Sequence, residues 1–584
     1  MGEFDKHFKI IFNDDSYQMR LGTDYTKSTV TERGDIAAIF NNKESEVKSI
    51  EINVDCDIPF YTNNNTFDDP RIPLLGTYIN SSGLLFSNLT NLSSIVVHQN
   101  NPYFSEINGV LFSKDVKILY TYPPGKSGNE YTIPSNVEKI NCLSFMNTSN
   151  LNNVIISNTT STNNVGVAAF ANATGLRRIT IPDNVTAYYS YSFYKCKNLT
   201  SFTTSNTILH IGGYAFYECT ELLTVTIPNH INKRSVWLYH SCFRNCSKLN
   251  SITLPDTIIF HENGYIFSEC VRLTRIIIPN SVTIIPISTF YSCTSLTSVS
   301  MPRELIEIRS TAFGLCRSLT TILLPNTLKI ISSMAFALCD SLTSLRIPES
   351  VTTIGSAFLS TCVNLTSVTF GSGIKIKSLS SSCFYRCIKL NSITIPEGVT
   401  TIGTNCFAGT QALTTITLPI SITSVASNAF SKTPMLNMDT LVLSTNQYYN
   451  SGLQTLYLSN TSLLTGLNLT EGTKSGLYGT TSTVNVIVVS NAPTAAGARA
   501  ITRSSSAPTP TPAPAPVDPS TVPASAEGVT TTSVSHSWLI RGIIGMCMII
   551  LLLVVFSLMS ATSIVPSSFL SSSSSSASAD LRSS

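Results

Sequence analysis

Cysteines are the residues of this sequence whose side chains and spacing could most readily do chemistry. There are 15 of them, and two pairs, Cys242 with Cys246 and Cys383 with Cys387, have C-x-x-x-C spacing. A structural zinc site needs four ligands, and histidine completes a set at neither pair, so we expect no metal and no cofactor. Most cysteines instead recur at one position of a repeat: Cys196, Cys219, Cys246, Cys270, Cys293, Cys316, Cys339, Cys362 and Cys387. There we expect a buried ladder of thiols, with adjacent rungs near enough for occasional bridging.

Histidines and the common catalytic motifs give no sign of enzyme chemistry. The seven histidines recur at no position of the repeat, and the sequence has no G-x-S-x-G, H-E-x-x-H, Walker or G-x-G-x-x-G motif. An active site can be assembled from residues far apart in sequence, but no pattern here predicts one. We therefore expect no catalytic residues and a protein that is not an enzyme.

Charge is scarce and evenly balanced. The chain has 37 Lys and Arg and 34 Asp and Glu, a net charge of +3, and charged residues make up 12% of it, about half the usual share in soluble proteins. Ser, Thr and Asn supply the remaining polarity. Because the basic residues form no block, the sequence predicts no nucleic-acid partner.

An internal repeat positions these residues. One unit, LTTILLPNTLKIISSMAFALCDS (319–341), begins with six alternating residues and a proline, which predicts one short strand per unit. Stacked units would pair their strands in parallel and share one core. We predict a single, elongated and curved leucine-rich-repeat solenoid, with a parallel sheet on one face and short turns or helical segments on the other. The repeat is marked by Phe145, Phe170, Phe193, Phe216, Phe243, Phe267, Phe290, Phe313, Phe336, Phe358, Phe384, Phe407 and Phe430.

The repeat resembles that of the BspA-like surface proteins, the treponemal type of leucine-rich repeat. The resemblance rests on L-x-x-[IV]-x-[IL]-P, S-V-T-x-I-G and A-F-x-x-C-x-x-L, as in LRIPESVTTIGSAFLSTCVNL (345–365), and covers residues 81–431. Residues 101–125 are similar to a hairpin insertion common in that family. The resemblance implies a surface-exposed adhesin or antigen of bacteria or protozoan parasites that binds host proteins or cells.

Composition divides the chain into six segments. We expect an N-terminal region and cap, the solenoid, irregular C-terminal repeats or a cap, a Pro/Ser/Thr-rich stalk, a transmembrane helix and a Ser-rich tail. Their predicted bounds are 1–80, 81–431, 432–490, 491–536, 537–565 and 566–584.

One stretch is long and apolar enough to span a bilayer. Residues 542–565, GIIGMCMIILLLVVFSLMSATSIV, contain no charge, whereas a buried core helix would ordinarily be shorter. The alternating prolines of 507–523 favour polyproline II and so a stalk, although a passive spacer could have the same composition. We therefore predict a single-pass plasma-membrane protein with its solenoid outside the cell.

Two columns of outward-pointing strand residues are mostly Ser and Thr. The high β-propensity of Thr would explain threonine there without any ligand. It does not explain Arg275, Ile277, Leu323 and Arg346, which form a mixed cationic and apolar group near the middle of the repeats. We call these four residues the central patch. We predict that it is the centre of a contact with a protein or a cell surface.

Two functions fit these features. One is a membrane-anchored cell-surface binding protein, an adhesin or surface antigen that uses the Ser/Thr-rich face. The alternative is a tail-anchored intracellular scaffold. It is favoured by the charged start MGEFDKHFKIIFNDD, which is not a signal peptide, and by unpaired thiols. The stalk and the family resemblance favour the first.

Overall fold

A computed structural model describes part of the chain. The chain divides into two compact units, 1–494 and 495–584, and every described residue lies in the first. The predicted stalk, transmembrane helix and tail therefore lie outside the described residues. Within the described ranges, no helix has the length and apolar character needed to cross a membrane. These ranges are 7–13, 17–21, 44–54, 56, 86–158, 164–417, 419, 421–422, 424–426, 429–433, 455–458, 472–475 and 483–488.

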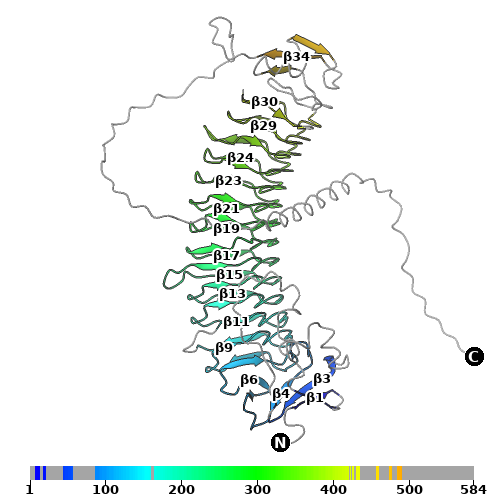
Figure 1. Cartoon of the computed structure of the whole chain (residues 1–584), viewed down its shortest axis with the longest axis vertical. Coiled ribbons are helices and arrows are strands. Elements are labelled where there is room, and N and C mark those ends of the chain that lie inside the picture. The colour runs from blue at the N-terminus through cyan, green and yellow to red at the C-terminus, as the bar shows by residue number, and fades with distance from the viewer. Residues whose placement is uncertain are drawn as a thin grey trace, which may run out of the picture. The chain divides into compact units, whose positions relative to one another are not determined.

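Nearly every regular coil begins with a short strand, in most coils just before a proline, and these strands form the first ladder. Outward and inward residues alternate in them as in Ser201–Thr203, where Phe202 is buried between two exposed neighbours, because successive strand side chains point to opposite faces. All pairings within the ladder are parallel. Figure 1 shows the coils stacked one above another. The strands are β8 (Glu130–Ile133), β10 (Asn153–Ile156), β11 (Arg178–Thr180), β13 (Ser201–Thr203), β15 (Thr224–Thr226), β17 (Ser251–Thr253), β19 (Arg275–Ile277), β21 (Ser298–Ser300), β24 (Ser344–Ile347), β26 (Ser367–Phe370), β28 (Ser392–Thr394) and β30 (Thr415–Thr417).

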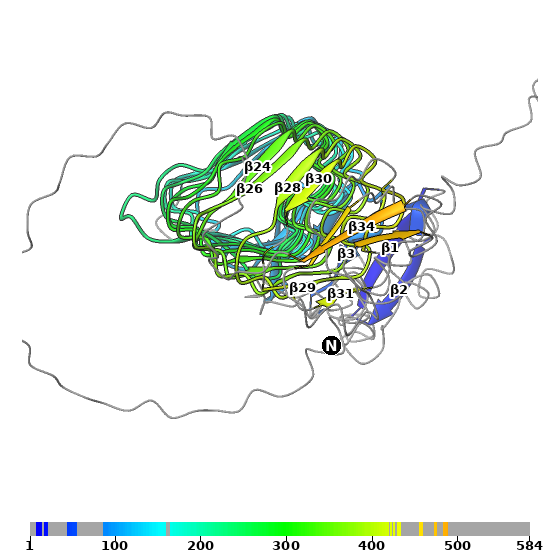
Figure 2. The ribbon, with the colours of Figure 1, turned by 90° about the horizontal axis from the view of Figure 1, so that it is seen from above.

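A second ladder of shorter strands lies on another side of the coils (Figure 2). These strands also pair in parallel, as in Ile308 beside Ile331. Of the short turns or helical segments expected on this side, the structure has turns together with short strands, and the described residues between 130 and 431 contain no helix. The physical reason is the run of β-branched residues after each proline, which favours extended backbone. The strands are β9 (Lys139–Ile140), β12 (Ala187–Tyr188), β14 (His210–Ile211), β16 (Val236–Leu238), β18 (Ile258–Phe260), β20 (Ile284–Ile285), β22 (Glu307–Ile308), β23 (Ile330–Ile331), β25 (Thr353–Ile354), β27 (Ser378–Leu379), β29 (Thr401–Ile402) and β31 (Ser424–Val425).

A hairpin precedes the regular coils, as the family resemblance implies for 101–125. Strands β5 (Phe104–Ile107) and β6 (Val110–Ser113) are antiparallel. Asn108 and Gly109, with φ of 52° and 77°, form the turn between them, as a two-residue hairpin with left-handed turn residues requires. Strand β7 (Ile118–Thr121) pairs with β6 and with β9, so the hairpin leads into the second ladder.

Two further sheets flank the coils in sequence. At the N-terminal end, the sheet order is β2-β1-β3-β4, and its buried residues share a second core with the first coils. At the other end, β34 lies between β32 and β33. The strands are β1 (His7–Phe12), β2 (Tyr17–Leu21), β3 (Val47–Ile52), β4 (Ser94–Val97), β32 (Thr455–Leu458), β33 (Gly472–Ser475) and β34 (Thr483–Val488), and a 3-10 turn, η2 (Glu44–Glu46), precedes β3.

The repeated phenylalanines stack inside the coils. Phe313 and Phe336 are both fully buried, with ring centroids 5.4 Å apart and planes 2° from parallel. Left-handed residues two positions before and after each ring, such as Thr311 and Leu315 around Phe313, turn the chain so that the ring points inward. The predicted role of the repeated phenylalanines is confirmed for these coils.

One coil departs from the predicted register. Leu359, not Phe358, occupies the phenylalanine position, since the thiol of Cys387 bonds to the carbonyl of Leu359 at 3.2 Å. Phe358 therefore meets Phe384 edge-on, at 77° between the ring planes. The sequence did hold a signal of this shift, because Cys362 lies three residues after Leu359, the spacing that other coils have after phenylalanine.

The predicted cysteine ladder is buried in the core, and its members are free thiols. Each thiol donates a hydrogen bond to a carbonyl oxygen of the preceding coil, as Cys339 does to Phe313 at 3.2 Å and Cys196 to Phe170 at 3.0 Å. Cysteine thus fills a small apolar position and also satisfies a backbone acceptor. The C-x-x-x-C pairs each contain one cysteine outside the ladder, Cys242 or Cys383, and both of these are buried and free as well.

Burial makes stability at alkaline pH depend on these thiols. Desolvation raises the pKa of Cys362 from its ordinary value of 9.0 to about 12. As pH rises, the Cys362 thiol therefore ionises in the unfolded chain before it ionises in the folded chain. The contribution of the protonated thiol to the free energy of unfolding is complete below pH 9 and is lost as pH rises toward 12. Between pH 9 and pH 10 we expect the free energy of unfolding to fall by about 1 kcal/mol less in Cys362→Ala than in the unchanged chain. Urea unfolding at pH 9 and pH 10 measures both slopes, and equal slopes would contradict the assignment.

Candidate binding face

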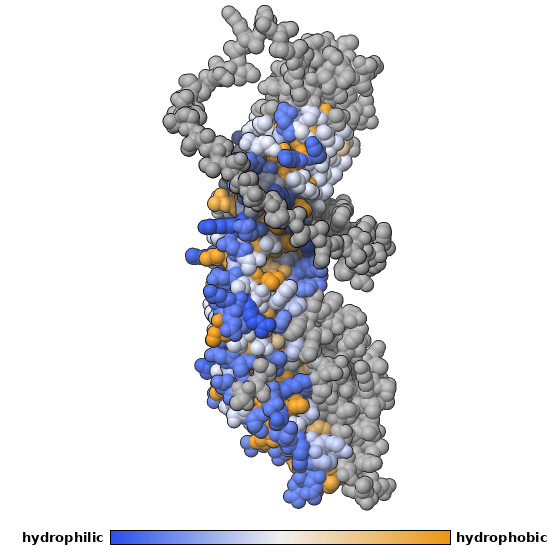
Figure 3. Space-filling model, turned by 60° about the vertical axis from the view of Figure 1, so that its left-hand side comes forward, coloured by the Kyte–Doolittle hydropathy of each residue, from blue (hydrophilic) through white to orange (hydrophobic). Residues whose placement is uncertain are grey.

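The outward residues of the first ladder form one broad face that is rich in hydroxyls. Among the residues whose side chains are described, all members of the two predicted columns are exposed except Ser367, which is half-buried. Figure 3 shows orange hydrophobic residues scattered among hydrophilic ones on one side of the molecule. The columns are Arg178, Ser201, Thr224, Ser251, Arg275, Ser298, Thr321, Ser344, Ser367 and Ser392, and Thr180, Thr203, Thr226, Thr253, Ile277, Ser300, Leu323, Arg346, Thr369 and Thr394.

The central patch lies on this face, with all four side chains exposed. Arg275 and Ile277 are on β19 and Arg346 is on β24. Ile277 is 72% exposed and Leu323 is 85% exposed, values unusual for large aliphatic side chains. Registers within the sheet place Ile277 beside Ser300 and Arg275 beside Ser298. Leu323 belongs to the coil after that of Ser300.

Leu323 is not on a strand, although the sequence predicts one there. The first ladder is divided into short sheets, with breaks after β11, β17, β21 and β26, and in the described part of the chain the break after β21 is the one at which a whole coil contributes no strand before β24. Where it continues, the position before the proline holds a buried isoleucine, as Ile278 and Ile347 do. Around the interruption the same position holds Met301 and Leu324, which are half-buried. Both are unbranched at Cβ, as is Leu254 beside β17, and the strand expected in 319–341 does not form.

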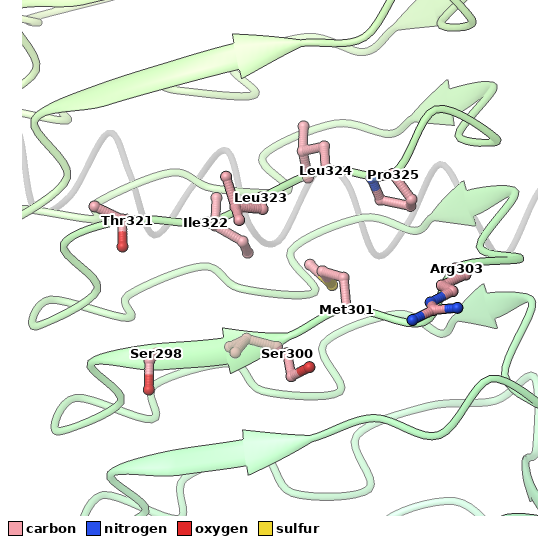
Figure 4. A pocket seen from close by; sticks show the side chains of 10 residues that line it. Ser298, Ser300, Met301, Arg303, Thr321, Ile322, Leu323, Leu324 and Pro325 are labelled. Carbon is pink, nitrogen blue, oxygen red and sulfur yellow. The ribbon is translucent and has the colours of Figure 1, made fainter.

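A pocket of about 370 Å³ opens at this interruption. Figure 4 shows Ser298 and Thr321 at one end of it, Arg303 at the other, and Met301 and Leu323 between them. Its walls come from β21 and from the coil that follows. The remaining lining residues are Val299, Ser300, Ile322, Leu324 and Pro325.

Within the described part of the chain, no carboxylate lies within salt-bridge distance of Arg303, which lines the pocket, or of Arg275 and Arg346 on nearby strands. Other exposed arginines, such as Arg178, have no such partner either, whereas Arg244 is paired with Glu269 at 2.7 Å. An unpaired guanidinium offers directed donors to a carboxylate from another molecule.

Met301 and Arg303 were not among the residues predicted for the site. The signal for Arg303 was in the repeat, because this position after the proline holds Asn280 in the coil before and Asn326 in the coil after. Met301 carried a similar signal, as an unbranched residue where Ile278 stands one coil earlier. Neither signal predicts a pocket without knowledge of where the ladder stops.

Other titratable side chains serve the packing of the coils. Among the described residues, no group of three His, Cys, Asp or Glu side chains could hold a metal ion. His230 and His240 are buried outside the strands. The ring of His240 meets Tyr214 edge-on at 4.9 Å between centroids, in the space left by Gly213.

Comparison with solved structures finds other leucine-rich-repeat proteins. A leucine-rich repeat protein from Bacteroides ovatus is 22% identical, with a TM-score of 0.48, and the match covers 66% of this chain and 97% of that one. A leucine rich cell surface protein from Faecalibacterium prausnitzii is 26% identical, with a TM-score of 0.39, over 64% of this chain and 100% of that one. No curated protein matches the sequence.

A family of repeats matches the sequence directly. Its description is BspA type leucine rich repeat region, and it matches residues 120–242, 230–325 and 306–437. Together these ranges cover 120–437, more than half of the 584 residues. They contain the phenylalanine stack, the thiol ladder and the central patch, so this chain belongs to the family of proteins with BspA-type leucine-rich repeats.

Proposed function

We propose that the protein is a membrane-anchored cell-surface binding protein, an adhesin or surface antigen, that makes protein or cell contacts through the exposed face of its first ladder. The observation that carries the proposal is the central patch. Two aliphatic side chains and two arginines are exposed in the middle of a face that is otherwise Ser and Thr except for Arg178. Apolar side chains supply desolvated area and arginine supplies directed hydrogen bonds, the combination found at the centres of protein interfaces.

The solenoid suits such a role because it is rigid. Each coil packs only on its neighbours, and together they give an extended surface on which the side chains are already positioned. A partner then loses little free energy to ordering of this face. The Ser and Thr columns would complete the fit around the central patch and form hydrogen bonds at its rim.

A second candidate, a tail-anchored intracellular scaffold, is supported by the cysteines. All fourteen described cysteines are free thiols, and unpaired thiols are typical of reducing compartments. Burial weakens this support, because desolvation raises the pKa of thiols such as Cys270, to about 12, and inert buried thiols persist in oxidising surroundings too.

Labelling of intact cells distinguishes the two candidates. Cells that express the full chain are treated with a membrane-impermeant biotin ester, which reacts with exposed lysines such as Lys197, Lys248 and Lys329. A surface protein should be labelled to a similar extent in intact and permeabilised cells. Labelling only after permeabilisation would reject the surface location and leave the intracellular scaffold.

A further inference from the structure

We infer that the pocket beside Leu323 binds one large apolar side chain of an extended protein segment that carries acidic residues on both sides of that side chain. The inference rests on the proposed function and assigns a partner chemistry to its binding face. Three observations carry it: the size of the pocket, the arginines around it, and the interruption of the ladder that opens it.

The size of the pocket fits a single side chain. Its volume of about 370 Å³ is near the lower end of the range for ligand pockets, about 300–1,000 Å³. Met301, Leu323 and Leu324 line its middle, so a bound side chain would meet mostly apolar atoms (Figure 4). A Leu, Met, Phe or Trp side chain placed there would bury apolar area that is now exposed on Leu323.

The charges around the pocket favour a bound segment with acidic residues on either side of its apolar side chain. Arg303 lines it directly, and Arg346 stands on the strand of the next coil. Among the described residues neither has a carboxylate within salt-bridge distance. Glu304 and Glu349 are exposed on the same coils, beyond the prolines. With Arg275 included, three arginines and two glutamates are therefore exposed around the pocket.

The spacing of the arginines sets the length of the segment. Arg275 and Arg346 lie three coils apart, about 15 Å along the stack at about 4.8 Å per coil. An extended chain covers that distance in about five residues, at about 3.3 Å each. Acidic residues about four or five positions apart, with one large apolar residue between them, would reach both arginines and the pocket.

The interruption also leaves backbone groups available at the wall of the pocket. Within the described part of the chain, the backbone groups of Thr321, Ile322 and Leu323 form no hydrogen bonds, whereas in the ladder Ile278 donates to Ser300 at 3.0 Å. A segment that runs along the stack crosses these residues, so it could offer them single main-chain N–H or C=O groups but not a strand pairing.

Selection of peptides tests this inference. The full-length chain, held in mild detergent, is used to select from a phage library of random 12-residue peptides. We expect the selected peptides to share one large apolar residue with Asp or Glu on both sides. Selected peptides without acidic residues, or selection of no peptide at all, would overturn the inference.

Variants then locate the binding. A selected peptide, labelled with fluorescein, should bind Leu323→Ser and the double variant Arg303→Gln with Arg346→Gln at least tenfold more weakly by fluorescence anisotropy. The matched control is Arg178→Gln, an exposed arginine of the same face on β11, which should leave the affinity unchanged. Unchanged affinity for Leu323→Ser would place the peptide elsewhere and reject the pocket.

The result separates this inference from the proposed function. Replacement of the whole central patch could abolish attachment to cells while no acidic peptide binds the pocket. That result would support the binding face and reject the acidic segment as its partner. The peptides could instead bind the pocket as expected while the chain is labelled only in permeabilised cells. That result would support the pocket as a peptide site and place the protein inside the cell.

Discussion

Replacing Phe336 with Ala is expected to lower the free energy of unfolding by about 3 to 5 kcal/mol. The ring is fully buried and stacks on Phe313 at 5.4 Å, and the carbonyl of Phe336 accepts the thiol of Cys362 at 3.2 Å. The missing ring would leave a cavity. The neighbouring coils cannot fill it, because their own Phe and Cys side chains are already held in the stack and in the thiol hydrogen bonds. Damage to one coil also weakens its interfaces with both neighbours.

Urea unfolding of the full chain measures this loss, and Phe370→Ala is a matched control. Phe370 is a phenylalanine of the same solenoid, on β26, but is only half-buried. Its removal should therefore cost clearly less than that of Phe336. Equal losses for the two variants would show that the phenylalanine position does not carry the core.

The periodic part of the fold could be predicted from the sequence because burial recurs with the repeat. Phe313 and Phe336 occupy equivalent positions, and so do Cys316 and Cys339, and each pair is buried. Alternation in the strands likewise predicted that Arg275 and Arg346 point outward. The buried Phe and Cys positions and the outward arginines depend on spacing within the repeat, which can be read from the sequence.

The remaining features depend on how neighbouring coils fit together. Whether the first ladder continues from β21 to the next coil cannot be told from the repeat, because its spacing is unchanged there. On the second side the sequence left turns or helical segments open, and the short strands found there form by pairing between coils. The pocket follows from the interruption and so could not be predicted.

The central patch should carry most of the binding energy of the exposed face. Replacing Arg275, Ile277, Leu323 and Arg346 together with Ser should reduce attachment at least tenfold, which corresponds to about 1.4 kcal/mol. Ile277 and Leu323 would lose the apolar area they offer to a partner, and the two arginines would lose their directed donors. Folding should be nearly unaffected, because all four side chains point away from the core.

A second quadruple variant provides a control of identical composition. Arg178, Leu223, Ile231 and Arg234 are also exposed, so replacing them with Ser removes the same four side-chain types from another part of the coils. Arg178 lies four coils from Arg275, about 20 Å along the stack. Attachment should therefore persist in this variant, and the thermal unfolding midpoints of both variants should match that of the unchanged chain.

Attachment of cells that display the full-length chain to a monolayer of cultured animal cells tests the central claim most directly. With equal display of all chains, the central-patch variant should attach at least tenfold less than the unchanged chain, and the control variant should attach normally. Full attachment by a correctly folded central-patch variant would contradict the account and move the binding site to the hairpin at 101–125 or to the face of the second ladder.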